Sequence, residues 1–170
     1  MDVNYKLGKL DDKKLGHLKN ILRYSKEAEP AHRQFLSHNT HGILRYDYKG
    51  AGPATLTPLS IKLNQPLTDF FEEEFNIIQN SIVSIHINEY EEGAECLPHR
   101  DSNSEDTILI LLNSCDVGGD LLLENKSIGL NEEGQYVSYN GGNVTHGVTK
   151  VEKGFRKTLV VWLRPKTSLI

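Results

Sequence analysis

Three side chains of types that bind transition metals stand out in the sequence. His99 and Asp101 are separated by one residue, and His146 lies in VTHGVTKV, a run with the composition of a β-strand. Residues i and i+2 of an extended chain point to the same side, about 6.6 Å apart. The set could therefore form a two-histidine, one-carboxylate face, typical of non-haem Fe(II), which leaves the opposite side of the metal open. An H-x-D tripeptide also occurs often by chance, so a solvated His and Asp in a loop is the alternative.

The bulk composition is that of an ordinary globular domain. The 170 residues are 38% hydrophobic and 25% charged, and a chain of this length can bury a core without disulfides. Two cysteines, Cys96 and Cys115, are too few for a disulfide framework, so a reducing, cytoplasmic location is expected. We find no secretory signal and no apolar stretch of about 18 residues, and therefore expect no membrane span.

Helical periodicity precedes a series of short β-rich runs. Two helices are expected from apolar residues at helical spacing, the first behind a cap at Asp11 or Asp12 and the second after Pro66 and Thr68. Their apolar residues are Leu15, Leu18, Ile21 and Leu22, and Leu67, Phe70, Phe71, Phe75 and Ile78. From residue 81 the strand-like runs are SIVSIHINEY, DTILILLN, GDLLLE, QYVSYN, VTHGVTKV and FRKTLVVWL. Helices followed by many short strands indicate an α+β fold with a sandwich or jelly-roll core that the helices brace.

Alternation along two of these strands separates an apolar face from a mixed one. In the first strand the mixed face holds Ser84, His86, Asn88 and Tyr90. In the last strand it holds Arg156, Thr158, Val160 and Trp162. The apolar faces can pack against helices or a second sheet. A polar interior is costly to bury without a ligand, so the mixed faces are expected to line a binding site.

These elements together resemble the iron(II)/2-oxoglutarate dioxygenase superfamily, in particular its prolyl-4-hydroxylase-like branch, over about residues 81–165. In that branch a Tyr precedes the H-x-D by nine residues, often with a Gly three after it, and a Gly-Gly follows the next strand. A basic residue comes ten positions after the distal His, and a Trp six beyond it. The matching residues are Tyr90, Gly93, His99, Gly118, Gly119, His146, Arg156 and Trp162. The chain departs from many members of the branch in having Arg156 where they have Lys.

The resemblance implies one catalytic domain over residues 1–170, with helical support in about 1–80 and a double-stranded β-helix, cupin-like, in about 81–165. It implies that His99, Asp101 and His146 hold Fe(II), the metal at which O2 reacts. Arg156 and Tyr90 would hold the far carboxylate of 2-oxoglutarate, and Asn88 and Trp162 are further cosubstrate-binding candidates. Ascorbate is a candidate reductant. Packing roles are the alternatives for Tyr90, Asn88 and Trp162, and His86 is expected to be a hydrogen-bonded scaffold residue.

Charge bears on the substrate. Residues 89–106 carry seven acidic groups against Arg100 alone, and the whole chain has a net charge of -4. Such a rim would repel phosphates, so hydroxylation of a protein, peptide or amino acid is favoured and a nucleic-acid partner is not. A nucleic-acid or nucleotide oxygenase or demethylase is the alternative, supported by seven basic groups against three acidic ones in residues 1–26. A non-enzymatic jelly-roll binding module is the third hypothesis. Loops at about 28–60, 91–106 and 125–134 are expected to set specificity.

Overall fold

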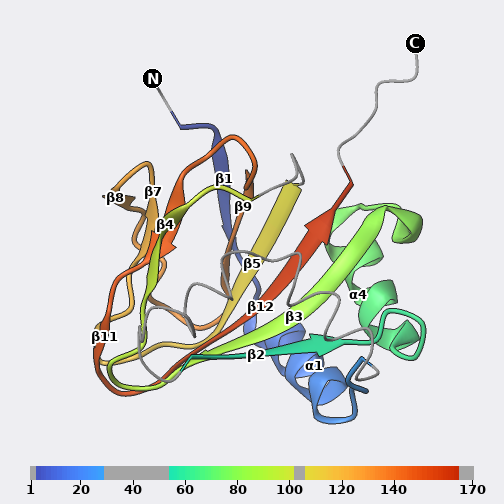
Figure 1. Cartoon of the computed structure of the whole chain (residues 1–170). Coiled ribbons are helices and arrows are strands. Elements are labelled where there is room, and N and C mark those ends of the chain that lie inside the picture. Colours follow the sequence, from blue (N-terminus) through green and yellow to red (C-terminus); the bar gives the residue numbers. More distant parts are fainter. Residues whose placement is uncertain (1–2, 29–53, 102–105, 165–170) are drawn as a thin grey trace.

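A computed structural model describes residues 3–28, 54–101 and 106–164, and Figure 1 shows its two facing β-layers. The larger sheet has the order β1-β9-β5-β12-β3-β2. Its strands are β1 (Tyr5–Lys9), β9 (Gln135–Asn140), β5 (Asp106–Asn113), β12 (Arg156–Leu163), β3 (Ile82–Tyr90) and β2 (Ala54–Leu59). The smaller sheet has the order β4-β10-β7-β8. Its strands are β4 (Cys96–His99), β10 (His146–Val148), β7 (Leu121–Leu123) and β8 (Lys126–Ser127), while β6 (Val117–Gly118) pairs separately with β11 (Val151–Lys153).

Two α-helices form where the sequence predicts them. The first, α1 (Asp12–Arg23), is capped by Asp11, whose side chain accepts a hydrogen bond from the Lys14 backbone N–H at 2.8 Å. The second, α4 (Gln65–Phe75), begins next to Pro66, and a one-turn 3-10 helix, η1 (Gln79–Ser81), follows it. Asn76 adopts a left-handed backbone conformation with φ of 51° and ends α4. Ile78 was predicted to lie on this helix, which is wrong: it follows the helix end and is 74% exposed.

All six predicted β-rich runs form strands, and β12 lies between β3 and β5 in the larger sheet. The antiparallel register pairs Arg156 with Tyr90 and Trp162 with Ser84. The mixed faces of β3 and β12 therefore lie on the same side of the sheet, as the alternation indicates. We call this side the inner face, because it is turned towards the smaller sheet (Figure 1).

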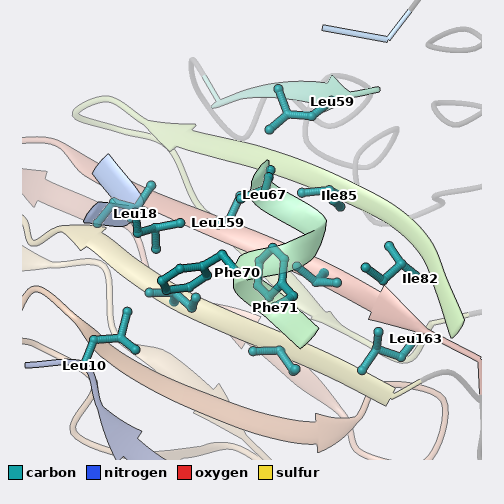
Figure 2. Packing of buried hydrophobic residues seen from close by; sticks show 14 of the residues in the cluster. Leu10, Leu18, Leu59, Leu67, Phe70, Phe71, Ile82, Ile85, Leu159 and Leu163 are labelled. Atoms are coloured by element: carbon teal, nitrogen blue, oxygen red, sulfur yellow. The ribbon is translucent and has the colours of Figure 1, made fainter. Parts of the chain in front are cut away.

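The outer face of the larger sheet packs against both helices. Figure 2 shows Phe70 and Phe71 of α4 beside Leu159 of β12, with Leu18 of α1 close by. A second apolar cluster lies between the sheets and is separate from the first. Its members include Leu109, Leu121, Leu123, Val137, Val148 and Val160. The two clusters show that the central strands β3, β5 and β12 contribute to a different core on each side of the larger sheet.

The region before residue 81 also contributes both edges of the larger sheet, through β1 and β2. Of the expected specificity loops, residues 29–53 and 102–105 lie outside the described part of the chain. Among the residues that the structure describes, no helix has the length and apolar character needed to cross a lipid bilayer.

Candidate active site

The antiparallel pairing of β4 with β10 brings the two histidines of the predicted metal site together. His99 is the last residue of β4, His146 is the first of β10, and the register pairs them directly. Their imidazole centroids are 4.4 Å apart. Asp101 Oδ1 lies 3.6 Å from His99 Nε2 and 3.4 Å from His146 Nε2. The three ligand atoms lie within 4.8 Å of one another, a spacing at which one ion can contact all of them.

A register irregularity in the β4–β10 pair aims His99 at this position. His99 and Cys96 pair with His146 and Val148, so that three steps on β4 oppose two on β10. Alternation alone would place residues three apart on opposite faces, but the irregularity, which has the character of a β-bulge, cancels that effect. Cys96 Sγ accordingly lies 3.5 Å from His99 Nδ1. The side chain of His99 thus points to the same side as the buried Cys96.

Backbone carbonyls fix the tautomer of both histidines. His99 Nδ1 lies 2.8 Å from the carbonyl oxygen of Leu97, and His146 Nδ1 lies 2.8 Å from that of Val144. A carbonyl oxygen only accepts hydrogen bonds, so in each ring Nδ1 carries the proton and donates it. In the neutral form of each ring Nε2 is then the nitrogen without a proton, which is the tautomer that a metal ligand requires, and it faces Asp101 Oδ1.

The electrostatics of the three residues favour a cation among them. Burial would raise the pKa of Asp101, but hydrogen bonds and charges from His146 and His99 hold that pKa well below its usual range. Burial also opposes a charge on His99, yet Asp101, with contributions from Cys96 and the Leu97 carbonyl, raises the pKa of His99 to about 10. A proton and a divalent metal ion therefore compete for the same His99 lone pair.

Gly141 leaves the space that the Asp101 carboxylate occupies. Its carbonyl accepts a hydrogen bond from the Asp101 backbone N–H at 2.9 Å. A Cβ at position 141 would lie 2.1 Å from Asp101 Oδ2 and 3.1 Å from Thr107 Oγ1. The absence of a side chain at this position thus lets the carboxylate turn towards the two histidines. The sequence analysis missed Gly141, because its role depends on a close approach between distant segments.

Arg156 is a buried cation with no partner among the described residues. It is 1% exposed, and its Nε, Nη1 and Nη2 atoms all lack a hydrogen-bond acceptor. Its Cζ lies 5.4 Å from the ring centroid of Tyr90, which contributes a cation–π contact but no negative charge. Burying a guanidinium without an anion is costly. The geometry therefore fits a carboxylate ligand, which a guanidinium can bind through two parallel hydrogen bonds.

Gly119, the second residue of the predicted Gly-Gly pair, lies against the Arg156 side chain. Its φ is +64°, and a Cβ there would lie 2.5 Å from Cys115 Sγ and 3.1 Å from Arg156 Cδ. A larger residue would therefore press on the stem of the Arg156 side chain. Asn88 and Trp162, the other predicted cosubstrate residues, lie on the same inner face, and Asn88 Oδ1 also has no partner.

Two buried residues near the site, Tyr139 and His86, were not predicted from the sequence to have a catalytic role. Tyr139 lies with its ring centroid 5.1 Å from that of His146, and burial raises its pKa well above the usual range. His86 packs edge-to-face on Trp162, with a centroid distance of 4.8 Å. It was expected to be hydrogen-bonded scaffold, but its Nε2 has no partner among the described residues. Side-chain alternation along the strand predicts that His86 lies on the inner face, but it does not predict which ring atoms lack a hydrogen-bond partner.

Solved structures with the same fold come from prolyl hydroxylases. The viral collagen prolyl hydroxylase of Paramecium Bursaria Chlorella virus-1, solved with 2OG, matches with a TM-score of 0.63 and 13% identity over 96% of each chain. A Pseudomonas putida prolyl-4-hydroxylase matches with a TM-score of 0.58 and 16% identity, covering 94% of this chain and 92% of the other. No family model and no curated protein matches the sequence. The expected α+β double-stranded β-helix is confirmed, and the resemblance to these hydroxylases is confirmed at the level of the fold.

Replacing Gly141 by Ala should weaken metal binding while leaving the chain folded. The new methyl group displaces the Asp101 carboxylate, so we expect Fe(II) or Mn(II) affinity to fall about 10- to 100-fold, as when partners of metal ligands are changed. Anaerobic titration with either metal measures this. Gly16→Ala is the control, since a Cβ there meets nothing within 4 Å in α1. Unchanged affinity in Gly141→Ala would show that Asp101 does not need this space.

His86 should make the stability of the protein depend on pH. Burial lowers its pKa from 6.5 to about 4. Above pH 6.5 the ring is neutral in both the folded and the unfolded chain. As the pH falls towards 4, the unfolded chain binds a proton that the folded chain excludes, which costs up to about 3 kcal/mol of stability.

Urea unfolding at pH 7 and pH 4 measures this loss. The variant His86→Gln lacks the titrating group, so its free energy of unfolding should fall by about 3 kcal/mol less than that of the unmodified chain. Equal losses in the two proteins would place the His86 pKa near its ordinary value.

Proposed function

We propose that this chain is an Fe(II)- and 2-oxoglutarate-dependent dioxygenase that hydroxylates a C–H bond of a protein, peptide or amino acid. The observation that carries the proposal is a His-Asp-His triad held by the smaller sheet together with a buried Arg156 on the inner face of the larger sheet, which has no hydrogen-bond partner among the described residues. A metal face alone fits many enzymes. A metal site together with a buried guanidinium that has no anionic partner among the described residues fits a cosubstrate that carries a carboxylate at one end.

His99, Asp101 and His146 are the residues that would hold Fe(II), with the hydrogen bonds from Nδ1 to Leu97 and Val144 leaving Nε2 of each ring as the nitrogen that would bind the metal. When bound, the iron and 2-oxoglutarate supply the oxidising chemistry, in which O2 is consumed and succinate and CO2 are released. Arg156 would bind the carboxylate of 2-oxoglutarate that is remote from the metal, beside Tyr90. The three ligands occupy one side of the metal position, so the other side is free for cosubstrate and O2.

The choice of a protein, peptide or amino-acid substrate has two lines of support. Both structural relatives described above are prolyl hydroxylases, one of them a collagen prolyl hydroxylase. The basic N-terminal segment, which favours a nucleic acid, is partly neutralised by ion pairs in the fold. Lys9, Lys14 and Lys19 contact Glu132, Glu74 and Glu133 at 2.6–2.9 Å.

A cytoplasmic location remains our proposal from the cysteine content.

The direct test measures succinate. Incubation of the protein with Fe(II), ascorbate and 2-oxoglutarate should release succinate, and a matching peptide or amino acid should increase the rate. His99→Ala is the control that removes a metal ligand. Succinate at the level of this control, across prolyl and other peptides and free amino acids, would contradict the proposed activity. Binding to DNA or RNA that weakens steeply with salt would instead favour the nucleic-acid alternative.

Arg156→Ala should separate cosubstrate binding from metal binding. The loss of a buried bidentate ion pair should weaken 2-oxoglutarate binding by about 2–4 kcal/mol. Metal affinity should stay nearly constant, since Arg156 is not one of the residues that could hold the ion in the described part of the chain. Calorimetry with Mn(II) and then 2-oxoglutarate measures both affinities. A parallel loss of metal binding would show that Arg156 has another role.

A further inference from the structure

A second group of unpartnered polar atoms lies on the inner face, away from Arg156. Ser84 Oγ, His86 Nε2 and Thr107 Oγ1 have no hydrogen-bond partner among the described residues, and the three residues are 3%, 1% and 1% exposed. A buried polar atom without a partner costs free energy comparable to a lost hydrogen bond. Three such atoms on β3 and β5, the two strands that flank β12, therefore indicate a position that a ligand or ordered water completes.

Strand register places Trp162 between Ser84 and Thr107. Trp162 of β12 pairs with Ser84 of β3 on one side and with Thr107 of β5 on the other. They form one row across three strands, which we call the Trp162 row. His86, two residues along β3 from Ser84, packs edge-to-face against the Trp162 ring with a centroid distance of 4.8 Å. Arg156 is at the opposite end of β12, so the two polar groups are distinct.

The Trp162 row reaches the metal position. A Cβ on Gly141 would contact both Thr107 Oγ1, at 3.1 Å, and Asp101 Oδ2, at 2.1 Å, so these two side chains flank the same small space. Tyr139, which pairs with Thr107 across β9 and β5, is also the residue whose ring approaches His146. The row thus borders the metal from a side that Arg156 does not occupy.

The chemistry of the row selects an uncharged partner. Burial lowers the pKa of His86 to about 4, so the ring is neutral near pH 7, with one donor and one acceptor nitrogen. The two hydroxyl groups can each donate and accept, and Trp162 offers an aromatic face. The carboxylate that the row reaches, Asp101, belongs to the triad, and no Lys or Arg is part of the row. An ammonium or carboxylate would therefore lack a counter-charge, whereas a planar amide would be satisfied.

We propose that Ser84, His86 and Thr107, beside Trp162, form a substrate subsite that binds an uncharged amide group next to the metal. As a subsite for the reaction, it rests on the proposed function, but its binding step can be measured without turnover. It makes the substrate a peptide or an amide-bearing side chain rather than a free amino acid held through its charges. His86 is in this view a specificity-determining residue.

The test uses the full chain loaded with Zn(II), which cannot turn over, and follows the His86 ring signals by NMR. Three probes of similar size are compared: N-acetylglycine N-methylamide, which is neutral, N-acetylglycine, which is anionic, and glycine N-methylamide, which is cationic. The neutral probe should cause a saturable shift of the His86 signals, and the two charged probes should not. No saturable shift with the neutral probe, or an equal or larger effect of a charged one, would overturn the proposal.

Variants, followed through the indole N–H signal of Trp162, the one tryptophan of the chain, then test which atoms are responsible. His86→Leu and Thr107→Val each remove one hydrogen-bonding group and should weaken binding of the neutral probe about tenfold, the effect of one such bond. His86→Gln should retain most of the affinity, because an amide side chain can still donate and accept. Thr68→Val in α4 is the matched control, since the hydroxyl of Thr68 is buried but donates to Gln65 in its own helix. Equal affinity in all four variants would assign the probe to another surface.

The same samples separate this proposal from the enzymatic one. 2-Oxoglutarate is titrated into the Zn(II)-loaded protein independently of the amide probes. Amide binding without 2-oxoglutarate binding would leave the subsite standing and remove the proposed reaction. Binding of 2-oxoglutarate without any amide effect on His86 would do the reverse, and the three polar atoms would then be sites for water.

Discussion

The alternation of side chains along β12 is the constraint on which both the core and the site depend. Leu159 and Val161 point outwards and are fully buried under the helices, while Arg156 and Thr158 point inwards and are also buried. A shift of one residue would exchange these two sets. Burying each aliphatic side chain stabilises the fold by about 1.5–3 kcal/mol, so the outer face fixes the register. The inner face can then hold a costly guanidinium, because the packing on the other side prevents the strand from moving.

Much of this arrangement could be predicted from the sequence, because it depends on local patterns. Period-two alternation in the runs around residues 82–90 and 156–163 gave the correct faces, and the Asp11 cap and helical spacing located α1. The types and spacing of His99, Asp101 and His146 suggested a metal site, and the family resemblance implied that Arg156 binds a carboxylate nearby. The structure brings ligand atoms of those three residues within 4.8 Å of one another and leaves Arg156 without a hydrogen-bond partner among the described residues.

Other features could not be predicted, because they depend on contacts between distant segments or on a single backbone conformation. Nothing in the short run CLPH shows that it is a strand whose register irregularity turns His99 inwards. The helical spacing that included Ile78 is real, but the left-handed Asn76 ends the helix before it. The sequence of β1, YKLGK, has a mostly exposed pattern and lacks a clear apolar face, so its place at the sheet edge was not apparent. The role of Gly141 depends on how closely its backbone approaches Asp101.

The smaller sheet is built from strands of only two to four residues, so few ladder hydrogen bonds connect them. His99 and His146 stand opposite each other on two of these strands, and any divalent ion shared by them is a cross-link between β4 and β10. A ligand that binds only the closed arrangement shifts the local opening equilibrium towards it. The backbone amides of β4 and β10 should then be protected from solvent in proportion to metal occupancy. Metal binding and the local opening of the β4–β10 pair are thus coupled equilibria.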